Sequence, residues 1–140
     1  MDKSLPLLLI TGINGFLGSW VTKKALDSGK YRVRGTIRDH TNKDKIELLK
    51  EAFGDQFDEI ELVSANLLDN DSLAKAVEGC EYVLHVASPF PPASPKDEDE
   101  VIKPAVDGTI GILQACVNST VKRVVTTSSI ACIQDPSLGD

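Results

Sequence analysis

The sequence predicts an α/β fold with a doubly wound parallel sheet, on the basis of three observations. Short apolar segments alternate with segments of helical periodicity, which is the pattern of a parallel sheet with helices on both faces. A glycine-rich turn, residues 11–18 (TGINGFLG), joins the first apolar segment directly to the first helical one. With 140 residues, 41% of them hydrophobic, the chain is long enough for a core of its own. We therefore expect residues 1–140 to form one domain of five strand–helix units.

Five segments have the composition of strands. The first is a continuous apolar run, which is typical of a buried strand. The second alternates between apolar and polar residues, as a half-buried strand does. The remaining three are short apolar segments after turn-forming residues. Strands are expected at residues 7–11, 31–38, 60–64, 82–86 and 121–127.

Four segments between these strands have helical periodicity. In the second of them, for example, Ile46, Leu49 and Phe53 recur at the spacing of one helix face. The third is preceded by Asp69 and Asn70, either of which is a candidate N-cap. Helices are expected at residues 15–28, 43–53, 71–77 and 98–117.

The glycine-rich turn predicts a phosphate-binding site. A strand that turns sharply into a helix directs free backbone N–H groups at the turn, and the helix dipole adds partial positive charge. Glycine lets a phosphate approach without a Cβ in its way. The spacing from Gly12 through Gly15 to Gly18 is Gly-x-x-Gly-x-x-Gly, rather than the Gly-x-Gly-x-x-Gly of the common dinucleotide fingerprint. We expect a pyrophosphate here, and a glycine-rich turn without a ligand is the alternative.

Arg38 is the last residue of the second predicted strand, where a dinucleotide site holds the adenosine ribose. A carboxylate there accepts the 2′-hydroxyl of NAD, whereas an arginine accommodates the 2′-phosphate of NADP. Lys45 on the following predicted helix can add a second cation, with Lys43 as its rival. Asp39 is the complication, because its carboxylate suits a ribose hydroxyl. The pattern favours NADP(H) as the cofactor.

Two further segments follow the third and fourth predicted strands. Asn66 and Leu67 are placed for contact with adenine, since an amide can both donate and accept there; a turn-forming asparagine is the alternative. The short segment of Val86, Ala87 and Ser88 would let the backbone pass close to the cofactor ribose. Both segments extend the predicted site across the carboxyl ends of the strands.

Other polar residues at the predicted strand ends indicate a role in the ligand site less clearly. His85 lies on an apolar strand, so we expect a core histidine with its hydrogen bonds satisfied rather than an acid–base catalyst. Residues 88–95 form a proline-rich loop, which is either part of the ligand site or a stiff connector. Thr127 and Ser129, after the fifth strand, place hydroxyls near the reactive ring of a cofactor, where they can hydrogen-bond a carbonyl substrate.

Composition excludes several function classes. The formal net charge of −6 argues against nucleic acid as a partner. No apolar run approaches the ~20 residues of a membrane span, and the N-terminus lacks the features of a signal peptide. The three cysteines, Cys80, Cys116 and Cys132, have no metal-ligand spacing, so we expect no metal site and reduced thiols in a cytoplasmic protein.

Taken together, these motifs resemble the extended short-chain dehydrogenase/reductases, which have a Rossmann fold and belong to the NAD-dependent epimerase/dehydratase superfamily. Within them the sequence is most similar to the group of dihydroflavonol 4-reductase, cinnamoyl-CoA reductase and anthocyanidin reductase. The resemblance covers nearly the whole chain. It is carried by residues 11–18, Arg38, residues 85–89, residues 101–106 (VIKPAV) with Gly108, and the strand end at residues 127–129.

The resemblance implies roles for individual residues. Ser129 would be the catalytic serine. The cofactor would contact Gly12, Asn14, Gly15, Phe16, Leu17, Arg38, Lys45, Asn66, Leu67, Val86, Ala87, Ser88 and Thr127. Two positions depart from the pattern of the family: Asn66 stands where an aspartate is usual, and Ile130-Ala131 stands where Ala-Gly usually follows the serine.

Such reductases also use a Tyr-x-x-x-Lys motif on a helix after the fifth strand. The tyrosines of this chain, Tyr31 and Tyr82, are followed four residues later by Gly35 and Val86, so neither carries that motif. The resemblance therefore implies that the chain is the N-terminal part of a longer protein and is inactive alone, because the motif, the later strands and the substrate domain are absent.

The function predicted for the intact protein is NADPH-dependent reduction of a carbonyl in a small or phenolic substrate. This chain would supply the cofactor half. The alternatives are a non-catalytic NADP-binding module and an NAD-dependent epimerase, dehydratase or hydroxysteroid dehydrogenase on the same fold. The sequence does not indicate an oligomeric state.

Overall fold

The computed structural model describes residues 4–89, 95, 97–117 and 119–134. Its centre is a five-stranded parallel sheet with the strand order β3-β2-β1-β4-β5. The predicted doubly wound α/β fold is therefore confirmed. The strands are β1 (Leu7–Thr11), β2 (Arg32–Ile37), β3 (Ile60–Ser64), β4 (Tyr82–His85) and β5 (Arg123–Thr126).

The helices connect these strands in the predicted order, with boundaries within two residues of the expected ones. Asp69 is the N-cap of the third helix, and its side chain accepts hydrogen bonds from the N–H groups of Asp71 and Ser72. Two short 3-10 helices were not predicted. The elements are α1 (Phe16–Ser28), α2 (Lys43–Phe53), α3 (Asn70–Val77), α4 (Asp99–Val117), η1 (Gly54–Glu59) and η2 (Ile130–Cys132).

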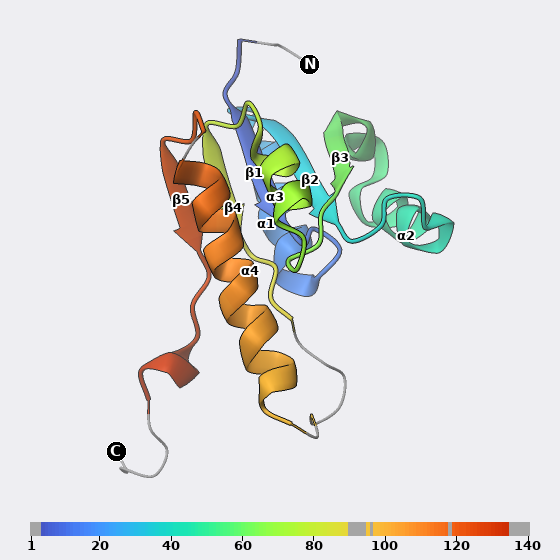
Figure 1. Ribbon diagram of the computed structural model, residues 1–140. Helices are drawn as coiled ribbons and strands as arrows, with labels where there is room; N and C mark the ends of the chain where they lie inside the picture. The colour runs from blue at the N-terminus through green and yellow to red at the C-terminus, as the bar shows by residue number, and fades with distance from the viewer. Residues whose placement is uncertain (1–3, 90–94, 96, 118, 135–140) are drawn as a thin grey trace.

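The helices form a layer on each face of the sheet (Figure 1). Alternate residues of β1 enter two separate cores: Leu8 and Ile10 pack with α1 and α2, while Leu7 and Leu9 pack with α3 and α4. Every residue of β1 is buried, which explains why this strand is apolar throughout rather than alternating.

The strand order creates a crevice at one end of the sheet. From β1 the chain moves to β2 and β3 on one side, and then crosses to β4 and β5 on the other. The loops after β1 and β4 therefore diverge where these neighbouring strands end, and a crevice opens between them. This is the position at which ligands bind in sheets of this kind.

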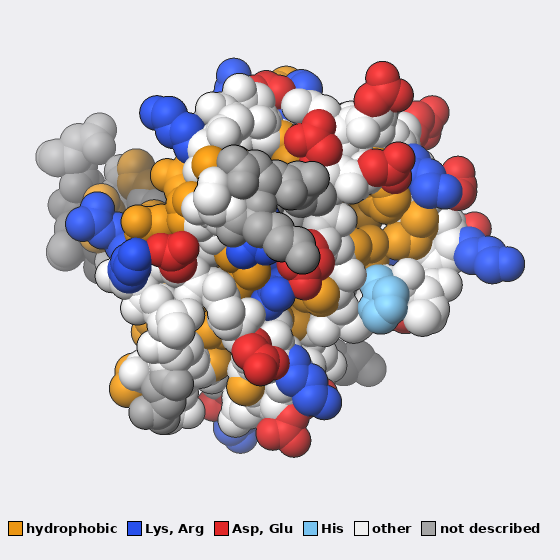
Figure 2. Space-filling view, turned by 90° about the horizontal axis from the view of Figure 1, so that it is seen from above, with side chains coloured by type: hydrophobic (Ala, Val, Ile, Leu, Met, Phe, Trp, Pro, Cys, Tyr) orange, Lys and Arg blue, Asp and Glu red, His pale blue; other side chains and the backbone are white. Residues whose placement is uncertain are grey.

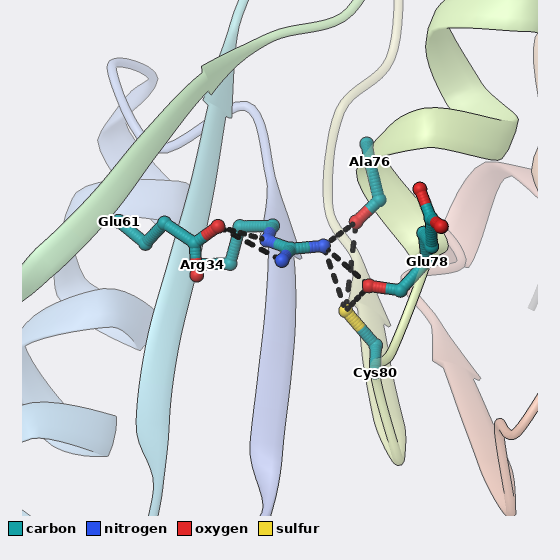
Figure 3. A network of polar contacts seen from close by, with 5 residues as sticks. All are labelled: Arg34, Glu61, Ala76, Glu78 and Cys80. Atoms are coloured by element: carbon teal, nitrogen blue, oxygen red, sulfur yellow. Dashed lines mark hydrogen bonds and ion pairs between the residues drawn. The ribbon is translucent and has the colours of Figure 1, made fainter. Parts of the chain in front are cut away.

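Arg34 on β2 ties the sheet to the end of α3 (Figure 3). Its Nη1 lies 2.8 Å from the carbonyl oxygen of Ala76 and 2.7 Å from that of Glu78, and its Nη2 lies 2.8 Å from Oε1 of Glu61 on β3. The guanidinium thus satisfies carbonyls at the negative end of the α3 dipole. Burial raises the pKa of the neighbouring Cys80 thiol to about 11 although Arg34 opposes the shift, so this cysteine stays protonated at neutral pH.

A second hollow lies on the α1 face of the sheet, beside β4 and β5. It has a volume of about 840 Å³, and among its lining residues Trp20 and Val125 are about half exposed. Seen from above, the surface of the molecule carries charges of both signs, interspersed with hydrophobic patches (Figure 2). None of the helices in the described segments has both the length and the apolar character that crossing a membrane requires.

Replacing Arg34 by methionine should lower the free energy of unfolding by about 2 kcal/mol, because two helix-end carbonyls lose a charged donor. The side chain of Glu61 is 47% exposed, so Glu61→Gln should cost no more than about 1 kcal/mol. Urea denaturation of the full-length protein measures both values. Equal losses in the two variants would show that the ion pair, rather than the contact with α3, carries the stabilisation.

Candidate functional site

A cavity of about 730 Å³ opens at the carboxyl ends of β1, β2 and β4. It brings together twelve of the thirteen residues predicted to contact a cofactor. These are Gly12, Asn14, Gly15, Phe16, Leu17, Arg38, Lys45, Asn66, Leu67, Val86, Ala87 and Ser88. The other lining residues include Thr11, Gly18, Thr36, Pro89 and Pro104.

The glycine-rich turn packs too closely to admit side chains at two positions. A Cβ on Gly18 would lie 2.1 Å from the carbonyl oxygen of Gly12, so only glycine allows α1 to begin this close to the turn. Gly12 has a φ of +72°, and a Cβ there would lie 3.0 Å from the Cβ of Ala87. The turn is therefore fixed against the segment after β4, and its backbone faces the cavity directly.

The N-terminus of α1 is open to an anion. Its N-cap, Gly15, makes no side-chain capping bond, and the first turn contains no acidic residue. In contrast, the side chains of Asn42 and Asp69 cap α2 and α3, and each of those helices has a carboxylate in its first turn. The first N–H groups of α1 have no intrahelical partner by geometry, so they can donate to a ligand in the cavity.

Thr36 on β2 holds the beginning of the turn. Its carbonyl oxygen lies 3.1 Å from the backbone nitrogens of both Gly12 and Ile13, and its Oγ1 lies 3.1 Å from the nitrogen of Gly12. The N–H of Gly12 is thus used within the protein. What glycine allows at position 12 is close packing against Ala87, and donors to a phosphate must come from later residues of the turn and from α1.

The side chain of Thr11 joins the ends of β1 and β4. Its Oγ1 accepts hydrogen bonds from the backbone N–H groups of Val86 and Ala87, both at 3.0 Å, and lies 2.9 Å from Nδ1 of His85. The two N–H groups occupy the acceptor capacity of the hydroxyl, which must therefore donate its proton to Nδ1. This contact fixes the backbone at the residues predicted to pass along the cofactor ribose.

His85 is consequently a neutral imidazole that carries its proton on Nε2. Only 3% of the residue is exposed, and burial lowers its pKa. The geometry agrees with the prediction of a core histidine whose hydrogen bonds are satisfied. Its position beneath the cavity wall gives it a structural task, which is to accept the proton of Thr11.

The cavity lining carries positive charge. Arg38, directly after β2, and Lys45, in the first turn of α2, both contribute to it, and no aspartate or glutamate of the described chain does. The rival cation, Lys43, and the complicating carboxylate, Asp39, lie outside the lining. In a chain with a net charge of −6, this local excess of positive charge favours an anionic ligand.

Asn66 and Leu67 lie after β3 and line the cavity, as does Pro104 of α4. The Oδ1 of Asn66 accepts a hydrogen bond from the N–H of Leu68 at 3.1 Å, so the side chain shapes the turn, as the alternative interpretation held. The amide nitrogen can still donate to a ligand. Leu67 packs against Gly108 of α4, where a Cβ would come within 2.8 Å of the leucine Cβ.

The predicted residues after β5 lie outside the cavity lining. Thr127 donates both its N–H and its hydroxyl to the carbonyl oxygen of His85, at 3.0 and 3.2 Å, which holds it against the end of β4. Ser129 is exposed and directly precedes η2, where its carbonyl oxygen accepts from the N–H of Cys132. Of the proline-rich loop, Ser88 and Pro89 line the cavity, whereas residues 90–94 lie outside the described residues.

Sequence reasoning assigned no role to Thr11 or Thr36. Both are the buried hydroxyl residues of strands that end at the cavity, and both line it. A threonine at the last position of an otherwise apolar strand was the available signal for Thr11. Its partners lie 74 to 76 residues away, so local pattern does not identify them.

The model of the NAD dependent epimerase/dehydratase family matches residues 8–138, and thus both the glycine-rich turn and the segment after β5. The chain belongs to this family. The resemblance inferred from the motifs is therefore confirmed at the level of the family.

Its curated relatives include oxidoreductases. The chain is 45% identical to vestitone reductase from Medicago sativa over 131 residues, which cover 92% of this chain and 40% of that protein. It is 40% identical to dihydroflavonol 4-reductase from Hordeum vulgare over 134 residues, 95% of this chain and 37% of that protein. The chain thus spans about two fifths of the length of these relatives.

Solved structures share the fold. The structure of vestitone reductase from alfalfa superimposes with a TM-score of 0.66 at 41% identity, covering 87% of this chain and 36% of that one. The yeast methylglyoxal/isovaleraldehyde reductase Gre2, solved in complex with NADPH, gives a TM-score of 0.77 at 30% identity and covers 94% and 39%.

Replacing Thr11 by valine should destabilise the protein by about 1–3 kcal/mol, because two backbone N–H groups and a ring nitrogen lose their partner in a buried place. Thr11→Ser retains the hydroxyl and should keep most of the stability. The free energy of unfolding in urea measures the difference between the two variants. A valine variant no less stable than the serine variant would contradict this role of the hydroxyl.

The depressed pKa of His85 predicts a pH dependence of stability. The unfolded chain takes up a proton near pH 6.5, while the folded protein does so only at lower pH, so the contribution of His85 is fully present above that pH and is lost as the pH falls below it. Unfolding free energies measured between pH 7.5 and 5.5 should therefore decline, and His85→Gln should flatten the decline. The matched variant His40→Gln, at an exposed histidine, should retain it; equal slopes in both variants would contradict the assignment.

Proposed function

We propose that the protein is an NADPH-dependent reductase of a carbonyl group in a small or phenolic substrate, and that this chain supplies the cofactor half of its site. The observation that carries the proposal is the lining of the cavity, to which the uncapped N-terminus of α1, Arg38 and Lys45 all contribute, whereas no aspartate or glutamate among the described residues does. The similarity to dihydroflavonol 4-reductase, vestitone reductase and methylglyoxal/isovaleraldehyde reductase supports the reaction class.

The residues present fit a phosphorylated dinucleotide. The close approach of the turn at Gly18 leaves backbone rather than side chains facing the cavity, as a pyrophosphate requires. The two cations lie on the wall formed by the end of β2 and the start of α2, which suits the 2′-phosphate. Asn66 and Leu67 would flank adenine, and residues 86–88 would line the ribose. The bound NADPH would supply the hydride.

The chain's own part in the reaction would be to bind and orient. Thr11 and Thr36 hold the two backbone segments that form the cavity walls, so the cofactor would meet a site that is already shaped. Thr127 and Ser129 end the neighbouring strand, and we assign Ser129 the donation of a hydrogen bond to the substrate oxygen. The proton donor would come from the part of the protein that this chain does not contain.

Lys45→Ala should weaken NADPH binding by about tenfold or more, because a charged hydrogen bond contributes about 1.5–3 kcal/mol. It should leave NADH binding nearly unchanged, since NADH lacks the 2′-phosphate. Arg38→Ala should behave in the same way. Dissociation constants for both nucleotides, measured by fluorescence titration of the full-length protein, check the expectation.

The matched control is Lys43→Ala, which removes the same charge from the same helix end but at a residue outside the cavity. The loss of NADPH affinity in Lys43→Ala should be clearly smaller than in Lys45→Ala. Equal losses of NADPH and NADH affinity in Arg38→Ala would contradict the assignment of the 2′-phosphate. A protein that binds NADH more tightly than NADPH would instead support an NAD-dependent member of the family.

A further inference from the structure

The eight residues 38–45, from the end of β2 into the first turn of α2, hold two carboxylates and three cations. Of these five charged residues, only Arg38 and Lys45 line the cavity. Asp39 is the immediate neighbour of Arg38, and a carboxylate at this end of β2 is the group that accepts a ribose hydroxyl in NAD-binding sites. Arg38 and Lys45 line the cavity, whereas Asp39 does not. Something in the loop therefore sets the direction of the Asp39 side chain.

The partner that holds Asp39 is Thr41. The Oδ1 atom of Asp39 accepts hydrogen bonds from the backbone N–H of Thr41 at 2.8 Å and from the Thr41 hydroxyl at 2.6 Å. The hydroxyl bond is the first cause, and the backbone bond the second, of a lowered pKa of Asp39, so the carboxylate is charged and engaged at neutral pH. These two bonds hold the carboxylate in an orientation that leaves Asp39 outside the cavity lining.

The loop around this pair is anchored on both sides. The backbone nitrogen of His40 lies 2.9 Å from Oγ of Ser64 at the end of β3, and the ring Nδ1 of His40 lies 2.6 Å from the same oxygen. On the other side, Asn42 accepts a hydrogen bond from the N–H of Lys45 and caps α2. Loss of the Thr41 hydroxyl would thus remove the shorter of the two bonds that hold the Asp39 side chain, leaving the backbone N–H of Thr41 as its one donor there, while the backbone of the loop keeps its anchors.

We propose that Thr41 is a positioning residue for nucleotide preference, which holds the Asp39 carboxylate away from the ribose and so leaves Arg38 and Lys45 to a 2′-phosphate. The inference rests on the proposed function. Once released, Asp39 would accept the 2′-hydroxyl of NADH, and it would repel the 2′-phosphate of NADPH. It would also compete for Lys45, whose charge already acts on Asp39 in the present arrangement.

The test compares Thr41→Val with Thr41→Ser in the full-length protein, by measuring the dissociation constants of NADPH and NADH. The valine variant keeps the shape and loses the hydroxyl, and it should shift the ratio of the two constants toward NADH by about tenfold, which corresponds to ~1.4 kcal/mol. The serine variant restores the hydroxyl and should keep the wild-type ratio. Equal weakening of both nucleotides in Thr41→Val would overturn the proposal, because a merely structural role predicts that result.

A third variant shows whether the effect passes through Asp39. In an Asp39→Asn background the carboxylate is absent, so adding Thr41→Val should leave the ratio unchanged. A shift of equal size in both backgrounds would overturn the inference. A wild-type protein that prefers NADPH, with an unchanged ratio in Thr41→Val, would overturn the role of Thr41 alone, whereas a wild-type protein that prefers NADH would overturn the proposed function as well.

Discussion

One hydroxyl group determines how the two halves of the sheet meet. The Thr11 side chain uses its single proton and its acceptor capacity at the same time, on His85 and on the backbone N–H groups of Val86 and Ala87. These contacts join β1 to β4 where the strand order reverses, which is the place that opens the crevice. Because Gly12 follows directly and packs on Ala87, the shape of the glycine-rich turn depends on the same junction. A buried hydroxyl here therefore fixes both walls of the cavity.

The sequence was sufficient for the fold because its signals are local. The continuous apolar run of β1, the helical spacing of Leu49 and Phe53, and the glycine-rich turn each depend on residues that are near one another in the chain. The contacts that shape the site are different in kind. The bonds of Thr11 span more than 70 residues. Thr127 was predicted beside the cofactor from its place at the end of the fifth strand and from the resemblance, and its hydrogen bonds to the backbone of β4 are a further long-range contact.

The N-termini of α1, α2 and α3 differ in whether their free N–H groups are bound within the chain or left open to a ligand. At α2 and α3 the sequence supplies a short polar cap, Asn42 or Asp69, and an acidic residue in the first turn, so the helix dipole is satisfied within the chain. At α1 the N-cap is Gly15, so the free N–H groups and the partial positive charge of the helix dipole are left for a ligand. The choice between a side chain and glycine at the N-cap thus separates α2 and α3, whose N-termini are capped within the chain, from α1, whose N-terminus is open to a ligand.

Because α1 and the loop before α2 offer a ligand different kinds of positive charge, their contributions to its affinity should depend differently on ionic strength. A dinucleotide bound as proposed would place its pyrophosphate on backbone dipoles, whereas its 2′-phosphate would meet the full charges of Arg38 and Lys45, of which Arg38 is exposed. Salt screens exposed full charges strongly and short contacts with backbone N–H groups much less. The general affinity for dinucleotides and the choice between NADP and NAD would therefore respond differently to the medium. Added salt would erode the discrimination first, and the protein would become less selective well before it ceased to bind.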